Sequence, residues 1–450
     1  MMFTWLIQHS PLLYFTQSVW RDEAFSIFVG EKSLSFIFQN LTFEPPVYYI
    51  LLHYWIRMFG TNEIAIRSLS LLGFTLATIV VIVWSEKLFR KHWLSWFTPI
   101  LFFTNPMLVY YAFEIRTYGW YMFFAVLSLY AYSQSRWRLW VIATMLGFYT
   151  HTYFLFLFAA QGIHWMVLHR SKLAKPLSLI REPMVASSVL AVSAMIPWIL
   201  RVIREAATLK QSWYFPVNIN LVKSVLGNMY LGYEGTPWYL WGFTAPLSLV
   251  LLVIFFIAVY KKSTRARNTM FLFSAIIPLA IVIGVSFIKP LFVNRYLISV
   301  TIAEVFLIAL AIEAIKNSFL QKFVAWCFVL GALAFNMWYP SQHAKLDIRT
   351  TIQEVNALKG KNDVILATSP LIFFETQYYS GDRRRVFLYN PHSVPFPWYV
   401  GGVLVTNDQM MSDLPVFPPS RAFLVAEDGT FTISYRAPPY ALAQKTKKGL

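Results

Sequence analysis

Stretches of about twenty mostly apolar residues recur along most of this chain, and they constrain its fold more than any other feature. The hydrocarbon core of a bilayer is about 30 Å thick, so a helix that crosses it needs roughly twenty apolar residues. Hydrophobic residues make up 57% of the 450 residues, and charged residues only 13%. Soluble globular proteins carry about 25% charged residues. We therefore expect an integral membrane protein and exclude a soluble enzyme, a disordered chain and a disulfide scaffold.

About eleven membrane-spanning helices are predicted within residues 1–339, which gives an all-α polytopic domain. The first covers 1–17, which lacks the charged start and the small-residue cleavage site of a signal peptide. The other predicted spans are 64–88, 93–111, 117–133, 139–150, 153–169, 184–200, 238–260, 269–288, 296–315 and 323–339. Residues 139–150 and 153–169 are short, and we expect these two helices to meet at a tight turn.

The distribution of basic residues predicts the orientation, because Lys and Arg concentrate in short cytoplasmic loops. One set of loops is dense in them: Arg90, Lys91, Arg136, Arg138, Arg170, Lys172, Lys175, Arg181, Lys261, Lys262, Arg265, Arg267, Lys316 and Lys322. The loops with Asp22, Glu114, His151 and Arg295, and the C-terminal tail, are then expected outside the cytoplasm. The protein is therefore expected to be a multi-pass protein of the plasma (inner) membrane with an extracytoplasmic active site. Because most of the net charge of +17 lies in loops and tail, we expect lipid headgroups or phosphate-bearing substrates as partners, and no nucleic acid.

The segment 18–63 between the first two spans is predicted to hold juxtamembrane helices. Apolar residues recur at helical spacing after Ser33, and a second run, Pro46 to Phe59, opens with prolines and stops at Gly60. At fourteen residues this run is too short to span, so we expect it to lie along the membrane surface.

Residues 340–450 have a different character and are predicted to form a small extracytoplasmic α/β domain. Four runs are typical of strands: 363–368, 385–389, 402–406 and 422–426. Residues 370–379 are typical of a helix, and strands that alternate with helices indicate an α/β fold.

Acidic residues number only 21, so each one near a membrane boundary is a candidate for function. Asp22 and Glu23 directly follow the first predicted span. Carboxylates at a helix start also suit the helix dipole, so a purely structural cap is the competing interpretation. Glu44 closes the same segment, and Arg67, Glu114 and Arg116 stand at the ends of neighbouring spans.

Six short motifs occur in one order along residues 15–340: Trp20–Ala24, Phe43–Tyr49 followed by Phe59-Gly60, Glu63–Arg67, Glu114–Tyr118, Tyr149–Tyr153 and Asn294–Tyr296. Together they resemble the motifs of membrane glycosyltransferases with the C-type fold. The nearest branch is the protein-mannosyltransferase-like group (family 39), which includes bacterial aminoarabinose transferases. Residues 340–450 resemble the outer domain of many bacterial members. One departure is Pro45, where the aminoarabinose branch often has a basic residue, and this leaves open which residue of the loop touches the donor phosphate.

The resemblance implies an inverting glycosyltransferase that moves a hexose or a pentose from a polyprenyl or dolichyl phosphate to a hydroxyl group. The acceptor could be a lipid, a glycan or a protein. A hydroxyl acceptor must lose its proton as it attacks, so one carboxylate is needed. The phosphate is already a good leaving group and needs cations to stabilise its charge, rather than a second carboxylate as in glycoside hydrolysis.

Asp22 is accordingly predicted to be the general base, with Glu23 as its catalytic neighbour. Glu23 and Glu44 are candidates to orient the acceptor or hold Asp22, and a structural role is equally open for each. Arg116 and Arg295 are predicted to bind the donor phosphate. The full set of substrate-binding candidates is Glu44, Arg67, Glu114, Arg116, His151, Arg295 and Tyr296.

No other His or acid has ligand spacing to His151, so no tightly bound metal or cofactor is expected. Assistance by a divalent cation stays open, because such ions assist some proteins of this fold. Two other functions also stay open. An O-antigen polymerase or ligase would carry a large outer loop rich in Arg and His. A transporter or flippase would carry charges at mid-membrane or paired broken helices in its two halves. Spans 64–88 and 238–288 have little of either, and Glu304 and Glu313 in 296–315 are the exceptions.

Overall fold

The computed structural model describes residues 2–89, 91–173, 181–208, 217–232, 240–261 and 264–438. The chain divides into two compact units. Met1–Phe15 and Leu34–Gln342 form a helical unit, whereas Thr16–Ser33 and His343–Leu450 form an α/β unit. The segment Thr16–Ser33, which the sequence analysis grouped with the membrane domain, therefore belongs with the C-terminal residues. Parts of the predicted basic loops, residues 90, 174–180 and 262–263, lie outside the described residues.

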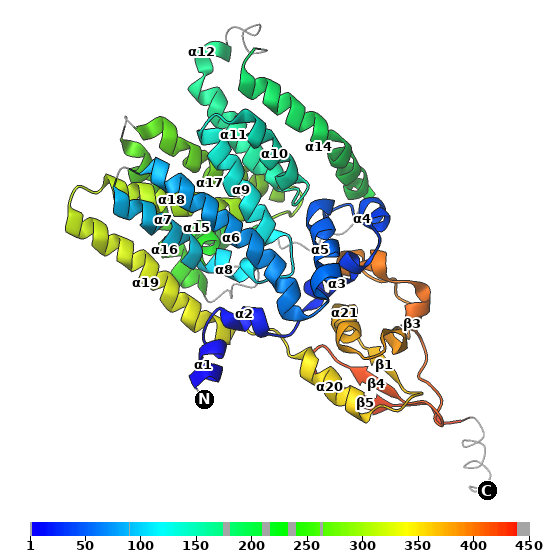
Figure 1. Cartoon of the computed structure of the whole chain (residues 1–450). Helices are drawn as coiled ribbons and strands as arrows, with labels where there is room; N and C mark the ends of the chain where they lie inside the picture. The colour runs from blue at the N-terminus through cyan, green and yellow to red at the C-terminus, as the bar shows by residue number, and fades with distance from the viewer. Residues whose placement is uncertain are drawn as a thin grey trace, which may run out of the picture. The chain divides into compact units, whose positions relative to one another are not determined.

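The helical unit is built from helices that run back and forth through it (Figure 1). They are α1 (Met2–Gln8), α2 (Leu12–Thr16), α4 (Leu34–Asn40), α5 (Pro46–Phe59), α6 (Glu63–Leu88), α7 (His92–Thr104), α8 (Pro106–Ala112), α9 (Tyr118–Ser133), α10 (Trp137–Phe148), α11 (Phe154–Leu168), α12 (Arg170–Leu173), α14 (Pro183–Thr208), α15 (Ile219–Leu231), α16 (Trp241–Tyr260), α17 (Arg265–Ser286), the 3-10 helix η3 (Asn294–Leu297), α18 (Ile298–Ala314) and α19 (Ser318–Gln342).

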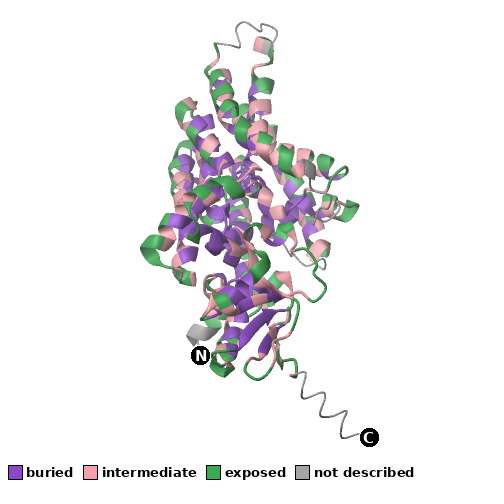
Figure 2. Cartoon of the chain, turned by 90° about the vertical axis from the view of Figure 1, so that its right-hand side faces the viewer, coloured by how far each residue is buried: buried purple, intermediate pink, exposed green. Residues whose placement is uncertain are grey.

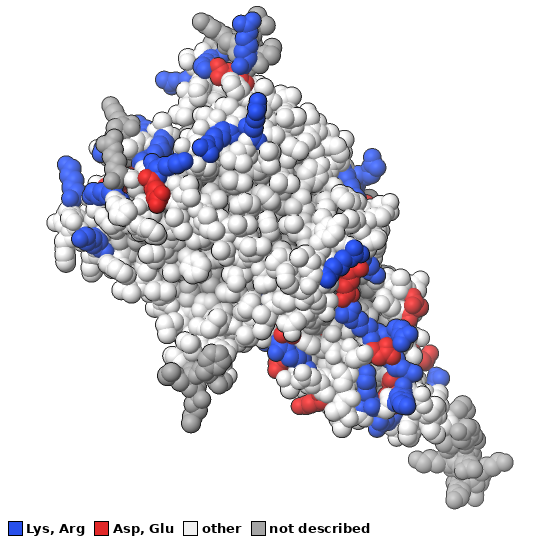
Figure 3. Space-filling model, viewed as in Figure 1, with Lys and Arg blue, Asp and Glu red and all other residues white. Residues whose placement is uncertain are grey.

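Several of these helices have the length and composition of membrane spans. Among the described residues, six are long and apolar enough to cross a bilayer: α6, α14, α16, α17, α18 with η3, and α19. The helices α10 and α11 are apolar but shorter. Large side chains such as those of Leu249, Phe256 and Phe319 are 64–80% exposed. On the face that Figure 3 shows, a broad area of the helical unit carries no charged side chain. The protein is a polytopic membrane protein.

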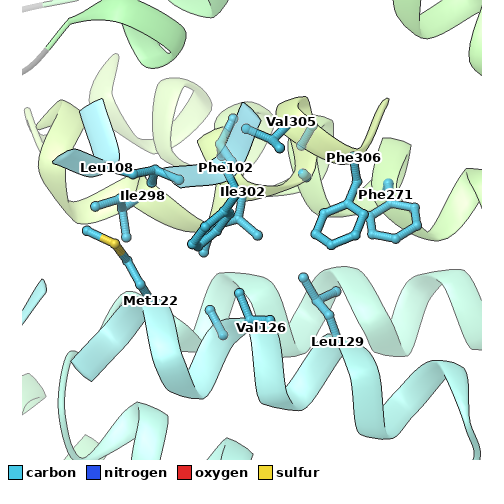
Figure 4. Packing of buried hydrophobic residues seen from close by; sticks show 14 of the residues in the cluster. Phe102, Leu108, Met122, Val126, Leu129, Phe271, Ile298, Ile302, Val305 and Phe306 are labelled. Atoms are coloured by element: carbon cyan, nitrogen blue, oxygen red, sulfur yellow. The ribbon is translucent and has the colours of Figure 1, made fainter. Parts of the chain in front are cut away.

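The core of the helical unit is centred on α18. Every residue from Ile298 to Ile312 is buried, which is the pattern of a helix that other helices enclose on all sides. Phe306 packs against Phe271 of α17, with ring centroids 4.7 Å apart, and against Trp84 of α6 at 4.6 Å. Figure 4 shows α18 facing residues of α9 such as Met122 and Val126. Buried residues gather inside this unit and along the strands of the sheet (Figure 2).

Two of the predicted spans are interrupted where the sequence places proline. The single helix expected over 1–17 is two short helices, α1 and α2, separated around Pro11. The span 93–111 is divided into α7 and α8 at Asn105-Pro106, where the Asn105 side chain accepts a hydrogen bond from the Leu108 N–H at 3.1 Å. Proline lacks the N–H that would continue a helix but fits the first position of a new one.

The two predicted helices of the segment 18–63 are confirmed as α4 and α5. Ile37 of α4 and Leu41, which directly follows this helix, supply buried apolar side chains, whereas the neighbouring Phe38 is 49% exposed. The helix α5 starts at Pro46 and ends before Gly60, whose φ of 78° lies in the left-handed region that glycine adopts easily.

The α/β unit is confirmed as a small five-stranded sheet with helices. Its strands are β1 (Val364–Ala367), β2 (Val386–Tyr389), β3 (Met410–Met411), β4 (Ala422–Val425) and β5 (Phe431–Ser434), in the order β3-β2-β1-β4-β5. The first four are parallel neighbours, and β5 pairs antiparallel with β4. Its helices are α3 (Arg21–Glu31), α20 (Ile348–Leu358) and α21 (Pro370–Tyr379), and α21 supplies the crossover from β1 to β2.

One predicted strand is wrong. Residues 402–406 do not pair in the sheet, and Gly402–Leu404 is instead the 3-10 helix η6. It follows Gly401, whose φ is 100° and where a Cβ atom would lie 2.4 Å from the Phe25 ring. The glycine pair therefore makes a tight turn against α3 rather than extended backbone. The short strands β3 and β5 and the helix α20 were not predicted.

Candidate functional site

Arg116 lies in the tight turn that precedes α9. Its N–H donates a hydrogen bond to the Glu114 carbonyl at 2.7 Å, and its own carbonyl accepts one from the Ser70 hydroxyl of α6 at 3.1 Å. Both residues are almost fully buried, with Arg116 7% and Glu114 2% exposed. The close contact between α6 and α9 therefore fixes the backbone from which the Arg116 side chain extends.

Arg295 lies in η3, immediately before the central helix α18. It is 3% exposed, and its guanidinium carbon lies 5.6 Å from the centre of the Tyr296 ring. Buried arginines are uncommon, because a desolvated cation must be balanced by polar or aromatic partners. Arg295 is therefore held in a place that an arginine solvated at the membrane surface would not occupy.

His151 lies in the turn between α10 and α11 and is surrounded by aromatic rings. It stacks on Tyr121 with centroids 5.2 Å apart, and it lies 4.9 Å from Tyr296 and 5.9 Å from Tyr118. Its Nδ1 accepts a hydrogen bond from the Tyr153 N–H at 3.2 Å. Burial, with smaller contributions from Arg116 and Arg295, lowers the pKa of His151 to about 3. His151 is therefore neutral at physiological pH, and both arginines lie close enough to contribute to the lowering of its pKa.

Glu44 joins this cluster through Arg116. Its carboxylate lies 2.7 Å from the Arg116 guanidinium and remains 28% exposed, whereas the Arg116 side chain is 8% exposed. The start of α5 is anchored nearby, because the Val47 N–H donates to the Tyr149 carbonyl at 3.0 Å. The predicted residues Glu44, Arg116, His151, Arg295 and Tyr296 thus come together in the helical unit. The result is a pair of buried guanidinium groups lined by tyrosine rings, an environment suited to an anion.

Arg67 has a contact of a different kind. It is fully buried in the first turns of α6 and donates a hydrogen bond to the Phe15 carbonyl at 3.1 Å. This bond ties α6 to the end of α2. A structural role is the simplest account of this contact.

Asp22 and Glu23 lie in the first turn of α3, in the α/β unit. Asp22 accepts a hydrogen bond from the Arg21 guanidinium at 3.0 Å, and its side chain is 15% exposed. Glu23 is fully buried, accepts the Trp20 N–H at 3.3 Å and lies 3.4 Å from the ammonium of Lys345. Glu23 is thus held as a cap and an ion-pair partner, whereas Asp22 is the more accessible carboxylate.

The cluster around His151 and the start of α3 each include a residue that the sequence did not indicate. Tyr121 stacks on His151, and Lys345 pairs with Glu23 although the two are 322 positions apart. No local pattern could have joined residues so distant along the chain. Among the described residues, no group of three or more His, Cys, Asp or Glu side chains could hold a metal ion.

Solved structures share this architecture, although no match is found by sequence. No protein-family model matches the chain, and no curated protein matches it. Among solved structures, ArnT from Cupriavidus metallidurans in the apo state is similar with a TM-score of 0.59 and 11% identity, over 99% of this chain and 93% of that one. The same protein bound to undecaprenyl phosphate gives a TM-score of 0.55, with the same identity and coverage.

The chain has the C-type glycosyltransferase fold. This confirms the fold that the six ordered motifs predicted. Because the similarity covers 99% of the chain, it takes in the C-terminal α/β residues as well as the C-type helical unit. At 11% identity the similarity concerns the fold, so the roles of individual residues rest on the contacts described above.

Proposed function

We propose that this protein is an inverting glycosyltransferase that transfers a sugar from a polyprenyl phosphate to a hydroxyl acceptor at the membrane surface. The observation that carries the proposal is the convergence of two buried arginines, Arg116 and Arg295, on His151 and its tyrosine rings. A guanidinium matches the oxygens of a phosphate through parallel hydrogen bonds, and such bonds are stronger where water is excluded.

The fold supports a lipid-linked donor. ArnT from Cupriavidus metallidurans has the same fold and has been solved with undecaprenyl phosphate, a polyprenyl phosphate. A polyprenyl chain needs a bilayer, and this protein has membrane spans. We extend the class of donor, but not the sugar, to this chain.

In the proposed reaction, Asp22 removes the proton of the acceptor hydroxyl as its oxygen attacks the anomeric carbon of the donor sugar. The bond between that carbon and the phosphate oxygen breaks with its electron pair on the phosphate. The configuration inverts because the acceptor oxygen attacks from the face opposite the phosphate. Arg116 and Arg295 stabilise the charge that grows on the departing lipid phosphate. The proton then leaves Asp22 for water. One carboxylate suffices because the phosphate needs no general acid.

The remaining residues position this machinery. Glu44 holds Arg116, and the Tyr296 ring lies beside Arg295. His151 stays neutral and orders the tyrosines around it, so it adds no charge that would compete with the arginines. We assign Glu114 to the turn that presents Arg116, and Arg67 and Glu23 to structural support. No resident cofactor is assigned.

The reaction is proposed to take place outside the cytoplasm, at the plasma membrane. The dense basic loops predict this orientation, because positively charged loops remain in the cytoplasm. The mass of the product will identify the acceptor class, because a glycosylated lipid, glycan and protein differ in mass.

The test is a reaction in proteoliposomes with a panel of radiolabelled polyprenyl-phosphate sugars, followed by mass spectrometry of the product. We expect consumption of one donor and release of the lipid phosphate. Asp22→Asn should reduce turnover by about a thousandfold or more, because an amide cannot accept the proton. Its elution from a sizing column should match that of the wild type.

Two results would contradict the proposal. Near-normal turnover by purified Asp22→Asn would remove Asp22 from the mechanism. Movement of the donor across the bilayer without its consumption would indicate a transporter. Glu304 gives that alternative a specific observation, because it is fully buried in α18 and neither carboxylate oxygen has a hydrogen-bond partner among the described residues.

A further inference from the structure

The helix that carries Asp22 is attached to the C-terminal residues along its whole length. Phe374 of α21 contacts Phe25 and Phe28 of α3, with ring centroids 6.1 and 5.9 Å apart. At the far end of α3, Arg383 lies 2.7 Å from the Glu31 carboxylate. Before its start, the Val19 N–H donates to the Tyr379 hydroxyl at 2.6 Å. The position of Asp22 therefore depends on α21.

Glu375 is the residue of α21 that reaches the start of α3. Its side chain lines a cavity together with Trp20, the residue that precedes α3, and with Lys345. Arg21 and Asp22, the first two residues of α3, lie close enough to shift its pKa. Glu375 is only 7% exposed. N–H groups in a first helical turn have no partner inside their helix, so a carboxyl group from another element can fix where the helix begins.

The charged groups around Glu375 come from several elements. Arg21 and Asp22 face it from α3, and Lys345 faces it from the segment before α20. Lys345 in turn pairs with Glu23. Glu375, Lys345 and Glu427 line a cavity of about 290 Å³, which gives the buried carboxyl group a route for proton exchange.

We propose that Glu375 is a positioning residue for Asp22, through which the C-terminal domain sets the place and the electrostatic surroundings of the catalytic carboxylate. This inference rests on the proposed function, in which Asp22 is the general base. In its protonated form, Glu375 places no second negative charge beside Asp22. In its ionised form, the two carboxylates repel each other.

The protonated form prevails at neutral pH. Burial raises the pKa of Glu375 to about 8, against the opposing effects of Arg21 and Lys345, and Asp22 contributes to the rise. The ordinary pKa of a glutamate is 4.5, so folding favours the protonated form of Glu375. The contribution of Glu375 to the free energy of unfolding is therefore fully present below pH 4.5. That contribution is lost as the pH rises through about 8.

The experiment compares kcat and the donor KM from about pH 6 to about pH 9 for Glu375→Gln, Glu375→Leu and the control Glu354→Gln. Glutamine keeps the acceptor oxygen and mimics the protonated acid. The wild type should lose activity above pH 8, where Glu375 ionises. Glu375→Gln should keep kcat within about twofold at pH 7 and should not show that fall. Glu375→Leu should lower kcat by about tenfold or more with little change in donor KM, because only the base is displaced. Glu354 is exposed in α20, so Glu354→Gln should keep the wild-type profile.

The outcomes separate this inference from the proposed function. If Asp22→Asn is inactive but both Glu375 variants keep the wild-type profile, Glu375 does not position Asp22 and the proposed function stands. If Glu375→Gln is as impaired as Glu375→Leu, a neutral acceptor is insufficient and the inference is overturned. If Asp22→Asn is active, the proposed function fails first. If Glu375→Leu does not fold, the kcat of Glu375→Gln above pH 8 decides. A fall there like that of the wild type would contradict the inference.

Discussion

At the scale of single residues, burial is what separates Arg116 and Arg295 from arginines that meet lipid headgroups. Arg265, which the basic loops include, donates to backbone carbonyls in an exposed setting. Arg116 and Arg295 are 7% and 3% exposed and lie beside a neutral histidine. Desolvation of a cation costs free energy, and two neighbouring buried cations also repel each other. Binding of an anion between Arg116 and Arg295 would therefore be strongly favourable.

Replacement of either arginine should therefore weaken donor binding. We expect Arg116→Gln and Arg295→Gln each to raise the donor KM by about tenfold or more, because a charge-assisted hydrogen bond to phosphate is lost. The matched control is Arg267→Gln, which removes an arginine paired with Glu313 at 3.0 Å. Initial rates over a range of donor concentrations would measure the effect. If KM is unchanged in both variants, the phosphate binds elsewhere.

The sequence could indicate these residues but not their environment. Asp22, Arg116 and Arg295 were found because their neighbours form motifs in a recognisable order. Glu375 and Lys345 carry no local signal, since their importance arises only where α21 and the segment before α20 pack against α3. Contacts between distant segments are a property of the tertiary structure, and one sequence does not reveal them.

At the scale of elements, the crossing of α6 and α9 supports the arginine cluster. The two helices pack backbone to backbone, because a Cβ atom at Gly119 would lie 2.1 Å from the Ser70 carbonyl oxygen. Gly73 is equally confined, with its Cβ position 2.6 Å from the Gly119 carbonyl carbon. The Ser70 hydroxyl then reaches the Arg116 carbonyl at 3.1 Å. The glycines thus bring α6 close enough to hold the turn of Arg116.

Gly119→Ala should push these helices apart. We expect a melting temperature several degrees lower in detergent and a higher donor KM, because the Arg116 turn moves with α9. Gly284→Ala in α17 is the control, since no atom lies within 4 Å of its Cβ position, and it should melt like the wild type. A Gly119→Ala protein that melts and binds donor as the wild type does would show that the crossing tolerates a wider spacing.

Elements were predictable where hydrophobic periodicity and breakers agree. The helix α5 begins and ends at the predicted residues because proline and glycine flank an apolar run. The strand predicted over 402–406 is wrong because Gly401 and Gly402 permit a turn, although the β-branched residues beside them are typical of a strand. Spans 1–17 and 93–111 were overextended because hydropathy averages across Pro11 and Pro106.

At the scale of the whole molecule, the C-type fold is retained at 11% identity with ArnT. Apolar composition and helix lengths preserve a membrane architecture while most side chains change, because many apolar residues fill the same space. The α/β unit also incorporates α3, so the predicted base and the C-terminal domain form one body. This arrangement gives the domain a role in the proposed reaction rather than a merely peripheral one.

The proposed reaction requires the α/β unit to lie outside the cytoplasm, and labelling of single cysteines tests this. With Cys327 replaced by serine, Asn362→Cys places a thiol in the exposed turn before β1, and Lys316→Cys places one in a predicted cytoplasmic loop. In sealed right-side-out vesicles, a membrane-impermeant maleimide should label Asn362→Cys at once and Lys316→Cys only after detergent is added. The reverse pattern would place Asp22 in the cytoplasm, because α3 folds with the C-terminal residues as one unit. The base would then be on the wrong side for an acceptor outside the cell, and the direction of transfer would have to be reassigned.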